Sequence, residues 1–474
     1  MRQMLILPGI QAVVGVLSLT VVAYAFYQCF LSPLAKVPGP FWAKFSNLYR
    51  IRLSRAGHFH RELIKLHEKY GNVLRIGPNN LSVAEPMAFR EIYRAGNKFP
   101  KDASYKVMKG TRPFDLTGET REDVHSSQRK LVARAYTMES MIHLEPKVDS
   151  MIRLFLEKLD TKIGETFDIG TWFQLFAFDI IGAVSFTRPF GFVEAGDDQG
   201  TFSRIQRSMA SITWVMQAPW VHRLQQRLKP IIGNWLAAND RNGYFFEFTS
   251  QEVTGRKDRG GDDKDILAQL FAVQKAKPHL SNVDIAYMMT SNVFAGSDTT
   301  STALRAAFFL LFKNPEKLRY LMEELGGKKA NGQLSDLVSS EEAKSCPYLQ
   351  AVIYEAMRLI PSVAMLLDRD VPQGGMTIGP YYIPKGVVVG SSPWVIHRLP
   401  EIWGADAEEF RPERWLNKET EGNLKRFFFA FGGGSRTCIG RNISWLEIEK
   451  LIPTILMRYK FHMAADLELK EDCG

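Results

Sequence analysis

Cysteine is scarce in this sequence, and no two cysteines form a CxxC pair. The 474 residues contain four of them: Cys29, Cys346, Cys438 and Cys473. A disulfide framework is therefore not expected, which fits a reducing compartment. Internal repeats are also missing, and no long low-complexity linker follows residue 40. One large domain is favoured over several.

Long runs of like charge are missing as well. The formal net charge of +9 is spread over the chain without five or six like charges in succession. This distribution gives little support to a nucleic-acid partner. It fits a basic face that docks an acidic protein or an anionic membrane, and it fits a scattered solvated surface equally well.

Apolar residues are concentrated near the start of the chain. The segment from Met4 to Leu31 is long enough to cross the hydrocarbon core of a bilayer, about 30 Å thick, as one helix. Aromatic residues gather toward its end, as suits a membrane interface. A cleaved signal peptide is the alternative, because Ala23-Tyr24-Ala25 resembles a cleavage site. The weakly charged start favours an anchor.

The segment Lys36-Val37-Pro38-Gly39-Pro40 is expected to act as a stiff hinge, because proline restricts φ and cannot continue a helix. Residues 1–36 are therefore predicted to form the anchor and hinge, and residues 37–474 a globular domain.

Helical spacing dominates the rest of the chain. Helices are predicted over 59–69, 141–159, 172–184, 283–312, 347–359 and 441–458. Residues 71–84 indicate a β-hairpin, and a second strand pair is expected between 381–383 and 387–389. The charged, glycine-containing stretch 251–265 is predicted to be an exposed loop. The fold class is mainly α with a small β region.

One glycine-rich loop surrounds its cysteine with residues that favour a reactive thiolate. The sequence FGGGSRTCIG, residues 431–440, precedes a helical pattern that starts near Arg441. Glycines let the backbone approach a flat ligand. A thiolate just before a helix is stabilised by free N–H groups and the helix dipole, and Arg436 adds a donor fork for a carboxylate. A buried structural cysteine is the alternative.

This loop resembles the heme-binding loop of the cytochrome P450 family, F-x-x-G-x-R-x-C-x-G. Every fixed position is occupied: Phe431, Gly434, Arg436, Cys438 and Gly440. The resemblance, which is to fungal microsomal members, extends from the proline hinge to about residue 463. It implies the cytochrome P450 fold preceded by one N-terminal transmembrane helix. It also implies heme b with Cys438 as the axial thiolate, whose electron donation favours O–O cleavage in this family.

Polar residues interrupt the apolar segment 294–302. Ala295 and Gly296 are small enough for a flat cofactor to approach, whereas Asp298 and Thr299 are costly in an apolar helix without partners. Taken alone, Asp298 favours the N-cap of a helix that begins at Thr299. The segment also resembles the family's A-G-x-D-T motif, which implies that Asp298 is the proton-relay acid and Thr299 the catalytic alcohol.

Further residues match the family's heme contacts. His125 and Arg129 lie four apart on one helical face, and the resemblance implies that both donate to the heme propionates. A surface polar pair is the alternative. Arg369, in an extended segment, resembles another propionate-binding arginine.

A second set of residues resembles a structural network of the same family. Glu355 and Arg358, three apart on a helix, resemble with Arg414 the family's Glu-Arg-Arg network, which has a structural role.

The resemblance implies a monooxygenase that uses dioxygen to oxidise an apolar small molecule, with a role in fungal secondary-metabolite biosynthesis. Electrons must come from a separate NADPH-cytochrome P450 reductase, because no flavin domain is fused. The expected location is the endoplasmic reticulum membrane, with membrane lipid around a single-pass anchor and the catalytic domain facing the cytosol.

Two alternatives stay open: an electron-independent heme-thiolate isomerase or dehydratase, and a non-catalytic membrane heme protein. Asp298 and Thr299 argue against the first. The second rests on the short C-terminus, because only 36 residues follow Cys438.

Overall fold

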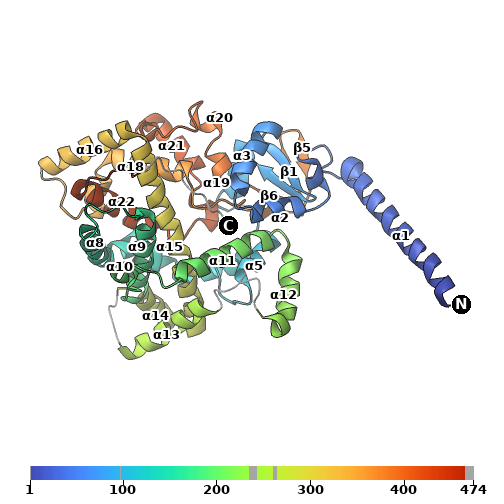
Figure 1. The fold of residues 1–474 in the computed structure, drawn as a ribbon, viewed down its shortest axis with the longest axis horizontal. Coiled ribbons are helices and arrows are strands. Elements are labelled where there is room, and N and C mark those ends of the chain that lie inside the picture. Colours follow the sequence, from blue (N-terminus) through green and yellow to red (C-terminus); the bar gives the residue numbers. More distant parts are fainter. Residues whose placement is uncertain (1, 97, 234–242, 260–263, 465–474) are drawn as a thin grey trace.

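The protein is described here as a computed structural model that covers residues 2–96, 98–233, 243–259 and 264–464. A long helix, α1 (Arg2–Phe26), projects from a body that is helical on one side and carries a small β-rich lobe on the other (Figure 1). The predicted fold class, mainly α with a small β region, is confirmed. The last ten residues, 465–474, which belong to the short C-terminus noted in the sequence, lie outside the described residues.

The centre of the helical part is α15 (Asn282–Lys313), a helix of 32 residues. Ser281 caps it by accepting from the backbone N–H of Asp284, whose carboxylate in turn accepts from the N–H of Ser281. α15 packs along α9 (Ile169–Phe186), which is almost wholly buried. The helix therefore starts at residue 282 and runs through Asp298. The N-cap interpretation of Asp298 is wrong, because the backbone there is already in mid-helix.

The other predicted helices are confirmed with small shifts at their ends. They are α3 (Phe59–Tyr70), α8 (Glu145–Asp160), α18 (Pro347–Leu359) and α22 (Arg441–Arg458). The start of the predicted helix 141–159 belongs to a separate short helix, α7 (Met138–Ile142). The division comes where Pro146 occupies the first turn of α8, a position that proline favours.

The prediction of an exposed loop over 251–265 is wrong for most of its length. α13 (Tyr244–Arg259) continues through this stretch, because Phe245 and Val253 are buried and the helix packs against α15. Residues 260–263 lie outside the description. Asp265 then caps α14 (Ile266–Ala276) by accepting from the N–H of Ala268 at 2.7 Å. Local composition favoured a loop, and tertiary burial overrode it.

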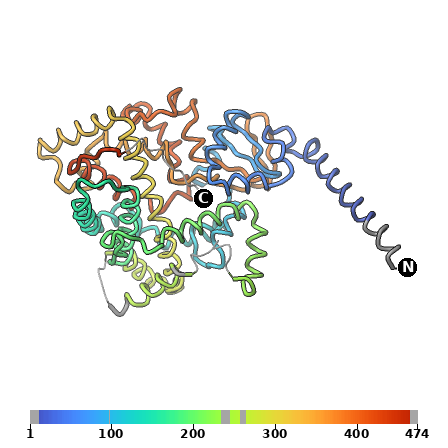
Figure 2. The backbone as a smooth tube through the Cα atoms, viewed as in Figure 1, coloured from blue at the N-terminus to red at the C-terminus, as the bar shows by residue number. Residues whose placement is uncertain are grey.

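Shorter helices complete the helical part and connect it to the lobe (Figure 2). They are α2 (Leu48–Arg55), α4 (Pro86–Tyr93), α5 (Lys106–Lys109), α6 (Glu122–Val132), α10 (Phe192–Ala195), α11 (Thr201–Val215), α12 (Pro219–Ile232), α16 (Pro315–Ala330), α17 (Ser340–Lys344), α19 (Pro393–Ile396), α20 (Pro400–Trp403) and α21 (Lys418–Phe427). Single turns of other helix types are η1 (Tyr27–Leu31), η2 (Phe41–Lys44), η3 (Ala103–Tyr105), η4 (Ala133–Tyr136), η6 (Pro412–Trp415) and η7 (Gly434–Arg436).

The lobe holds a four-stranded sheet of order β1-β2-β6-β3. β1 (Val73–Gly77) and β2 (Asn80–Val83) form the predicted antiparallel hairpin. β6 (Val388–Gly390) lies parallel to β2, and β3 (Arg369–Asp370) lies antiparallel to β6.

The second predicted strand pair is wrong in its partners. β5 (Tyr381–Ile383) turns back at Gly379, which has φ of 53°, and pairs with β4 (Met376–Ile378). The segment after it is buried throughout and joins the larger sheet as β6 instead.

Among the residues that the structure describes, two helices are long and apolar enough to cross a membrane by length and composition. The first covers Gln11–Leu31, with mean hydropathy 1.8 and 6% of its window buried. The second, Ile169–Phe186, is 72% buried and is the core helix α9. An exposed apolar N-terminal helix is therefore present, and the apolar character of α9 is explained by burial in the protein core.

Candidate active site

The cysteine loop is held closed by its own backbone. The N–H of Cys438 donates to the carbonyl of Phe431 at 2.8 Å, and the Thr437 hydroxyl donates to the carbonyl of Gly434 at 2.9 Å. Gly434 has φ of 60°, and a Cβ there would lie 2.7 Å from the carbonyl oxygen of Tyr93. Both the conformation and the contact require glycine. The match to the family pattern at this position therefore has a direct steric reason.

The Cys438 sulfur lies at the N-terminus of α22 and remains accessible within the described chain. Although Cys438 is exposed by surface area, the protein packed around it desolvates the thiol and raises its pKa, while the backbone N–H groups of Gly440 and Arg441 donate to the sulfur and act in the opposite direction. The positive charge of Arg129 also lowers this pKa. The N–H donors and the nearby cation that were predicted for this cysteine are therefore present, although burial outweighs them and the pKa of the thiol is raised.

Ala295 and Thr299 form an exposed face, one turn long, on the central helix α15. Phe294 and Thr300 beside them are buried. The Thr299 hydroxyl donates to the carbonyl of Ala295 at 2.8 Å, and the Ser362 hydroxyl donates to the carbonyl of Thr299 at 2.8 Å. An exposed alanine and threonine in the middle of a core helix mark the part of α15 that a bound molecule can reach.

Gly296 serves a different contact from the one expected. A Cβ at this position would lie 3.1 Å from the side chain of Ile181 on α9. Its small size therefore allows α9 and α15 to pack closely, and Ala295 supplies the accessible small residue of the motif.

Asp298 is held by a partner that sequence reasoning missed. Its Oδ1 accepts a short hydrogen bond from the side-chain amide of Gln174 on α9. The Gln174 carbonyl oxygen accepts from Arg305 at 3.0 Å, and Arg305 also donates twice to the carbonyl of Gly170. Burial raises the pKa of Asp298, and Gln174 and Arg305 lower it. No local pattern marks Gln174, which is 124 residues from Asp298.

Cationic side chains gather beside the cysteine loop. Burial, together with the charges of Arg436, Lys101 and Arg129, lowers the pKa of His125 to about 3, so its imidazole is neutral at pH 7 and the positive charge here belongs to the arginines. Arg369 donates to the carbonyl of Asp368 at 2.9 Å and lies over the ring of Tyr93. Within the described ranges, neither Arg129 nor Arg369 forms an ion pair. This group of cations fits an anionic ligand with carboxylates.

Arg436 is paired within the chain. Its guanidinium donates to Glu122 on α6, with Nη2 2.6 Å and Nε 3.1 Å from Oε1, and Nη1 donates to the carbonyl of Glu119 at 2.7 Å. Lys101, which the sequence pattern did not mark, donates to the carbonyl of Thr117 at 2.6 Å. Burial lowers its pKa well below the ordinary value, and Arg369 and Arg436 act in the same direction.

The predicted Glu-Arg-Arg network is confirmed. Glu355 accepts from Arg358 at 2.8 Å through both oxygens, from Arg414 at 2.8 Å and from the indole of Trp415 at 2.8 Å. Arg358 also donates to the carbonyl of His397 at 2.6 Å, and His397 accepts from the N–H of Phe429 at 2.7 Å. These bonds connect α18 to the segment that leads into the cysteine loop.

Comparison with known proteins decides the family. The family model described as Cytochrome P450 matches residues 37–472. The chain belongs to the cytochrome P450 family. This P450 is 51% identical over 494 residues to "Cytochrome P450 monooxygenase hepC" of Aspergillus oryzae, covering 100% of the chain and 95% of that relative.

Two further relatives are more distant. "Cytochrome P450 monooxygenase cicH" of Emericella nidulans is 34% identical over 462 residues, covering 94% of the chain and 92% of the relative. "Pisatin demethylase" of Fusarium vanettenii is 34% identical over 483 residues, covering 98% and 93%.

The residues of this P450 fit the cofactor of its family, heme b with a cysteine thiolate ligand. Cys438 offers an accessible sulfur with two N–H donors. The neighbouring Gly440 does not crowd the sulfur, and even an added Cβ there would lie 3.9 Å from Sγ, an ordinary van der Waals contact. Arg129 and Arg369 offer cations for the propionates. The protein is a P450 monooxygenase, and its cofactor is heme b.

Proposed function

We propose that this P450 oxidises an apolar small molecule in fungal secondary metabolism, with dioxygen and electrons from an NADPH-cytochrome P450 reductase. One observation carries the proposal: the chain exposes both Cys438, before α22, and the turn of α15 that holds Ala295 and Thr299. The curated relatives come from filamentous fungi, and one is named for demethylating pisatin, a small organic molecule.

The bound heme supplies dioxygen activation, and the chain's own residues supply positioning and protons. Arg129 and Arg369 would hold the propionates, with His125 and Lys101 beside them. Arg436 fixes the cysteine loop to α6 through Glu122. These contacts set the position of the cofactor relative to α15.

Proton delivery is assigned to Asp298 and Thr299. Burial raises the pKa of Asp298, which is the direction expected of a carboxyl group that passes on a proton. Gln174 and Arg305 hold that carboxyl in one position. Thr299 lies next to it in the chain, with its hydroxyl on the accessible face of α15. The proposed path of the proton runs from Asp298 to the exposed face of α15, where the Thr299 hydroxyl and solvent would pass it on.

Thr299→Ala is expected to lower the ratio of product formed to NADPH consumed by about a hundredfold, the usual size of a lost acid–base contribution. NADPH consumption should fall much less, because the variant leaves Cys438 and the outer surface of the protein unchanged. Thr299→Ser, which keeps the hydroxyl, is the matched control and should retain most of the coupling. Metabolites, NADPH and oxygen are measured with the reductase co-expressed. Equal coupling in Thr299→Ala and the parent protein would remove Thr299 from the mechanism.

The same assay separates the two alternatives. An electron-independent isomerase or dehydratase forms product without NADPH, whereas a non-catalytic heme protein forms none under any condition. NADPH-dependent product excludes both.

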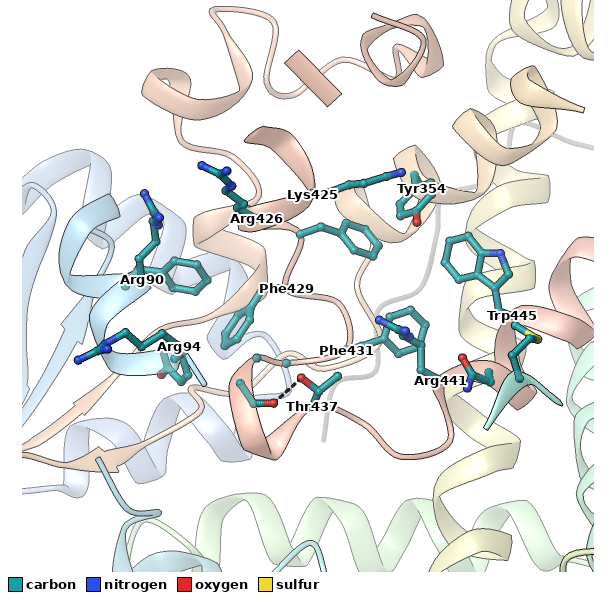
Figure 3. A pocket seen from close by; sticks show the side chains of 18 of the residues that line it. Arg90, Arg94, Tyr354, Lys425, Arg426, Phe429, Phe431, Thr437, Arg441 and Trp445 are labelled. Atoms are coloured by element: carbon teal, nitrogen blue, oxygen red, sulfur yellow. Dashed lines mark hydrogen bonds between the residues drawn. The ribbon is translucent and has the colours of Figure 1, made fainter. Parts of the chain in front are cut away.

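Electron entry is assigned to a basic hollow of about 600 Å³ beside the cysteine loop (Figure 3). The loop residues Phe431 and Thr437 line it, so it lies close to the heme ligand. None of its lining residues is acidic, and six are cationic: Arg90, Arg94, Lys344, Lys425, Arg426 and Arg441. All six are exposed. Such a surface attracts an acidic protein partner.

Arg426→Glu should slow reduction of the heme by the reductase about tenfold at low ionic strength, because it reverses a charge at the docking surface. The difference from the parent should shrink as salt is added, since exposed charges are screened. Arg153→Glu, an equal change on the exposed side of α8, is the control. Stopped-flow reduction under carbon monoxide measures the rate. A salt-independent defect, or an equal defect in both variants, would argue against this face.

The N-terminal helix is assigned to the membrane. Residues 1–36 form the anchor and residues 37–474 the catalytic domain, which faces the cytosol at the endoplasmic reticulum. The length, hydropathy and exposure of Gln11–Leu31 support this assignment, and so does the need to meet a membrane-bound reductase.

A further inference from the structure

The buried guanidinium of Arg75 joins the N-terminal helix to the β-rich lobe. Arg75 lies on β1 and is 0% exposed. Its Nη2 donates to the side-chain oxygen of Gln28 at 2.5 Å and to the carbonyl of Pro78 at 2.7 Å. Its Nη1 donates to the carbonyls of Gln28 and Leu34, both at 3.2 Å. One side chain therefore binds the end of the apolar helix and the segment that follows it.

The backbone around this contact is equally fixed. The N–H of Arg75 donates to the carbonyl of Pro38 at 2.7 Å. A Cβ at Gly39 would come within 2.1 Å of the carbonyl oxygen of Arg75, so no larger residue fits there. Leu34 and Val37 are buried in the core of the lobe. The segment predicted as a hinge is therefore packed against the domain at Val37, Pro38 and Gly39, whereas Lys36 is exposed.

The helix itself does not end before it reaches this joint. α1 continues directly into the π-helical turn η1. This turn ends where the N–H of Ser32 donates to the carbonyl of Tyr27 at 2.7 Å. The Tyr24 hydroxyl donates to the carbonyl of Phe45 at 3.1 Å, a second bond between helix and domain. Phe30 and Trp42 beside the joint are exposed, as suits residues at a lipid surface.

We propose that Arg75 is a positioning residue that locks the membrane helix to the catalytic domain at a fixed angle. The proposal rests on the membrane anchoring assigned above. A buried guanidinium is stable only when its N–H groups have acceptors, and here Gln28 supplies two of them. The lock therefore sets the tilt of the heme plane, and the height of the basic hollow, relative to the bilayer.

The test uses the full-length heme-loaded protein in oriented bilayers. Linear dichroism of the heme band reports its tilt. Amide hydrogen exchange over residues 28–35 reports the joint, and does so without reference to the heme. The variants are Arg75→Ala, Gln28→Ala, and Gln28→Glu, which keeps an acceptor for Arg75. Arg52→Ala, an exposed arginine on the neighbouring α2, is the control for loss of charge.

Gln28→Ala should reduce heme dichroism and exchange about tenfold faster over 28–35, the effect of losing one charge-assisted bond, and Arg75→Ala, which loses all of these bonds, should show at least as large a change. Gln28→Glu and Arg52→Ala should behave as the parent protein. Unchanged dichroism and exchange in Gln28→Ala would overturn the proposal, even if Arg75→Ala fails to fold. Liposome flotation is run in parallel. If the parent protein does not float with the liposomes, the proposed membrane anchor is wrong. If the variants float and keep the heme tilt of the parent, only the proposed role of Arg75 is wrong.

Discussion

Cys438→Ser is expected to abolish the thiolate signature of the heme and all NADPH-dependent product. The reason lies in the donor set: the sulfur has two backbone N–H donors and a nearby cation, all of which favour the anionic ligand. A serine hydroxyl at the same position stays protonated at neutral pH and is a much poorer donor of electron density to iron. The spectrum of the reduced protein with carbon monoxide measures the change, together with heme content.

Cys346→Ser is the matched control for this experiment. Cys346 is buried, and its thiol contacts the carbonyl of Glu342 at 3.5 Å, away from the cysteine loop. This variant should keep the parent spectrum and activity. If Cys438→Ser also kept the parent spectrum, the assignment of the axial ligand would be wrong, and with it the proposed activity.

Glu355→Ala is expected to destabilise the folded protein by about 3–5 kcal/mol, the usual result of removing one partner from a buried ion pair. Arg358 and Arg414 both lose their carboxylate partner, and the Trp415 indole loses its acceptor. All of these groups are buried, so water cannot replace the bonds. Denaturant unfolding measures the loss, and heme content reports the effect on the cysteine loop.

The effect should be confined to the network. Glu419→Ala, an exposed glutamate on α21, is the control and should stay within about 0.5 kcal/mol of the parent protein. Because the network has no contact with Asp298 or Thr299 among the bonds described, any folded Glu355→Ala protein should keep its coupling of NADPH to product. A stability equal to that of the parent would show that the buried pairs are replaceable.

The parts of the site that lie close together in sequence could be predicted, and the structure explains why. The cysteine loop spans ten residues, and its glycine at 434 is required by a local backbone angle and one close contact. The helices with strong apolar periodicity were predicted almost to their ends. α13 was missed, because its charged C-terminal half shows composition typical of a loop while its buried half packs on α15.

Residues that act through distant partners could not be predicted. Gln174 reaches Asp298 only because α9 packs along α15, and Glu122 reaches Arg436 across 314 positions of sequence. Lys101 looks like an ordinary surface lysine until the strand bridge to Arg369 brings it beside other cations. Such contacts follow from packing, which single-sequence patterns do not encode.

The bonds of Arg75 bear on where the chain can be shortened for work in solution. A truncation at the proline segment would remove the oxygens of Gln28 and Leu34 and leave a buried guanidinium with unsatisfied donors. A soluble form is better begun at Tyr27. This start leaves out the apolar helix α1 and retains the oxygens of Gln28 and Leu34 that accept from Arg75.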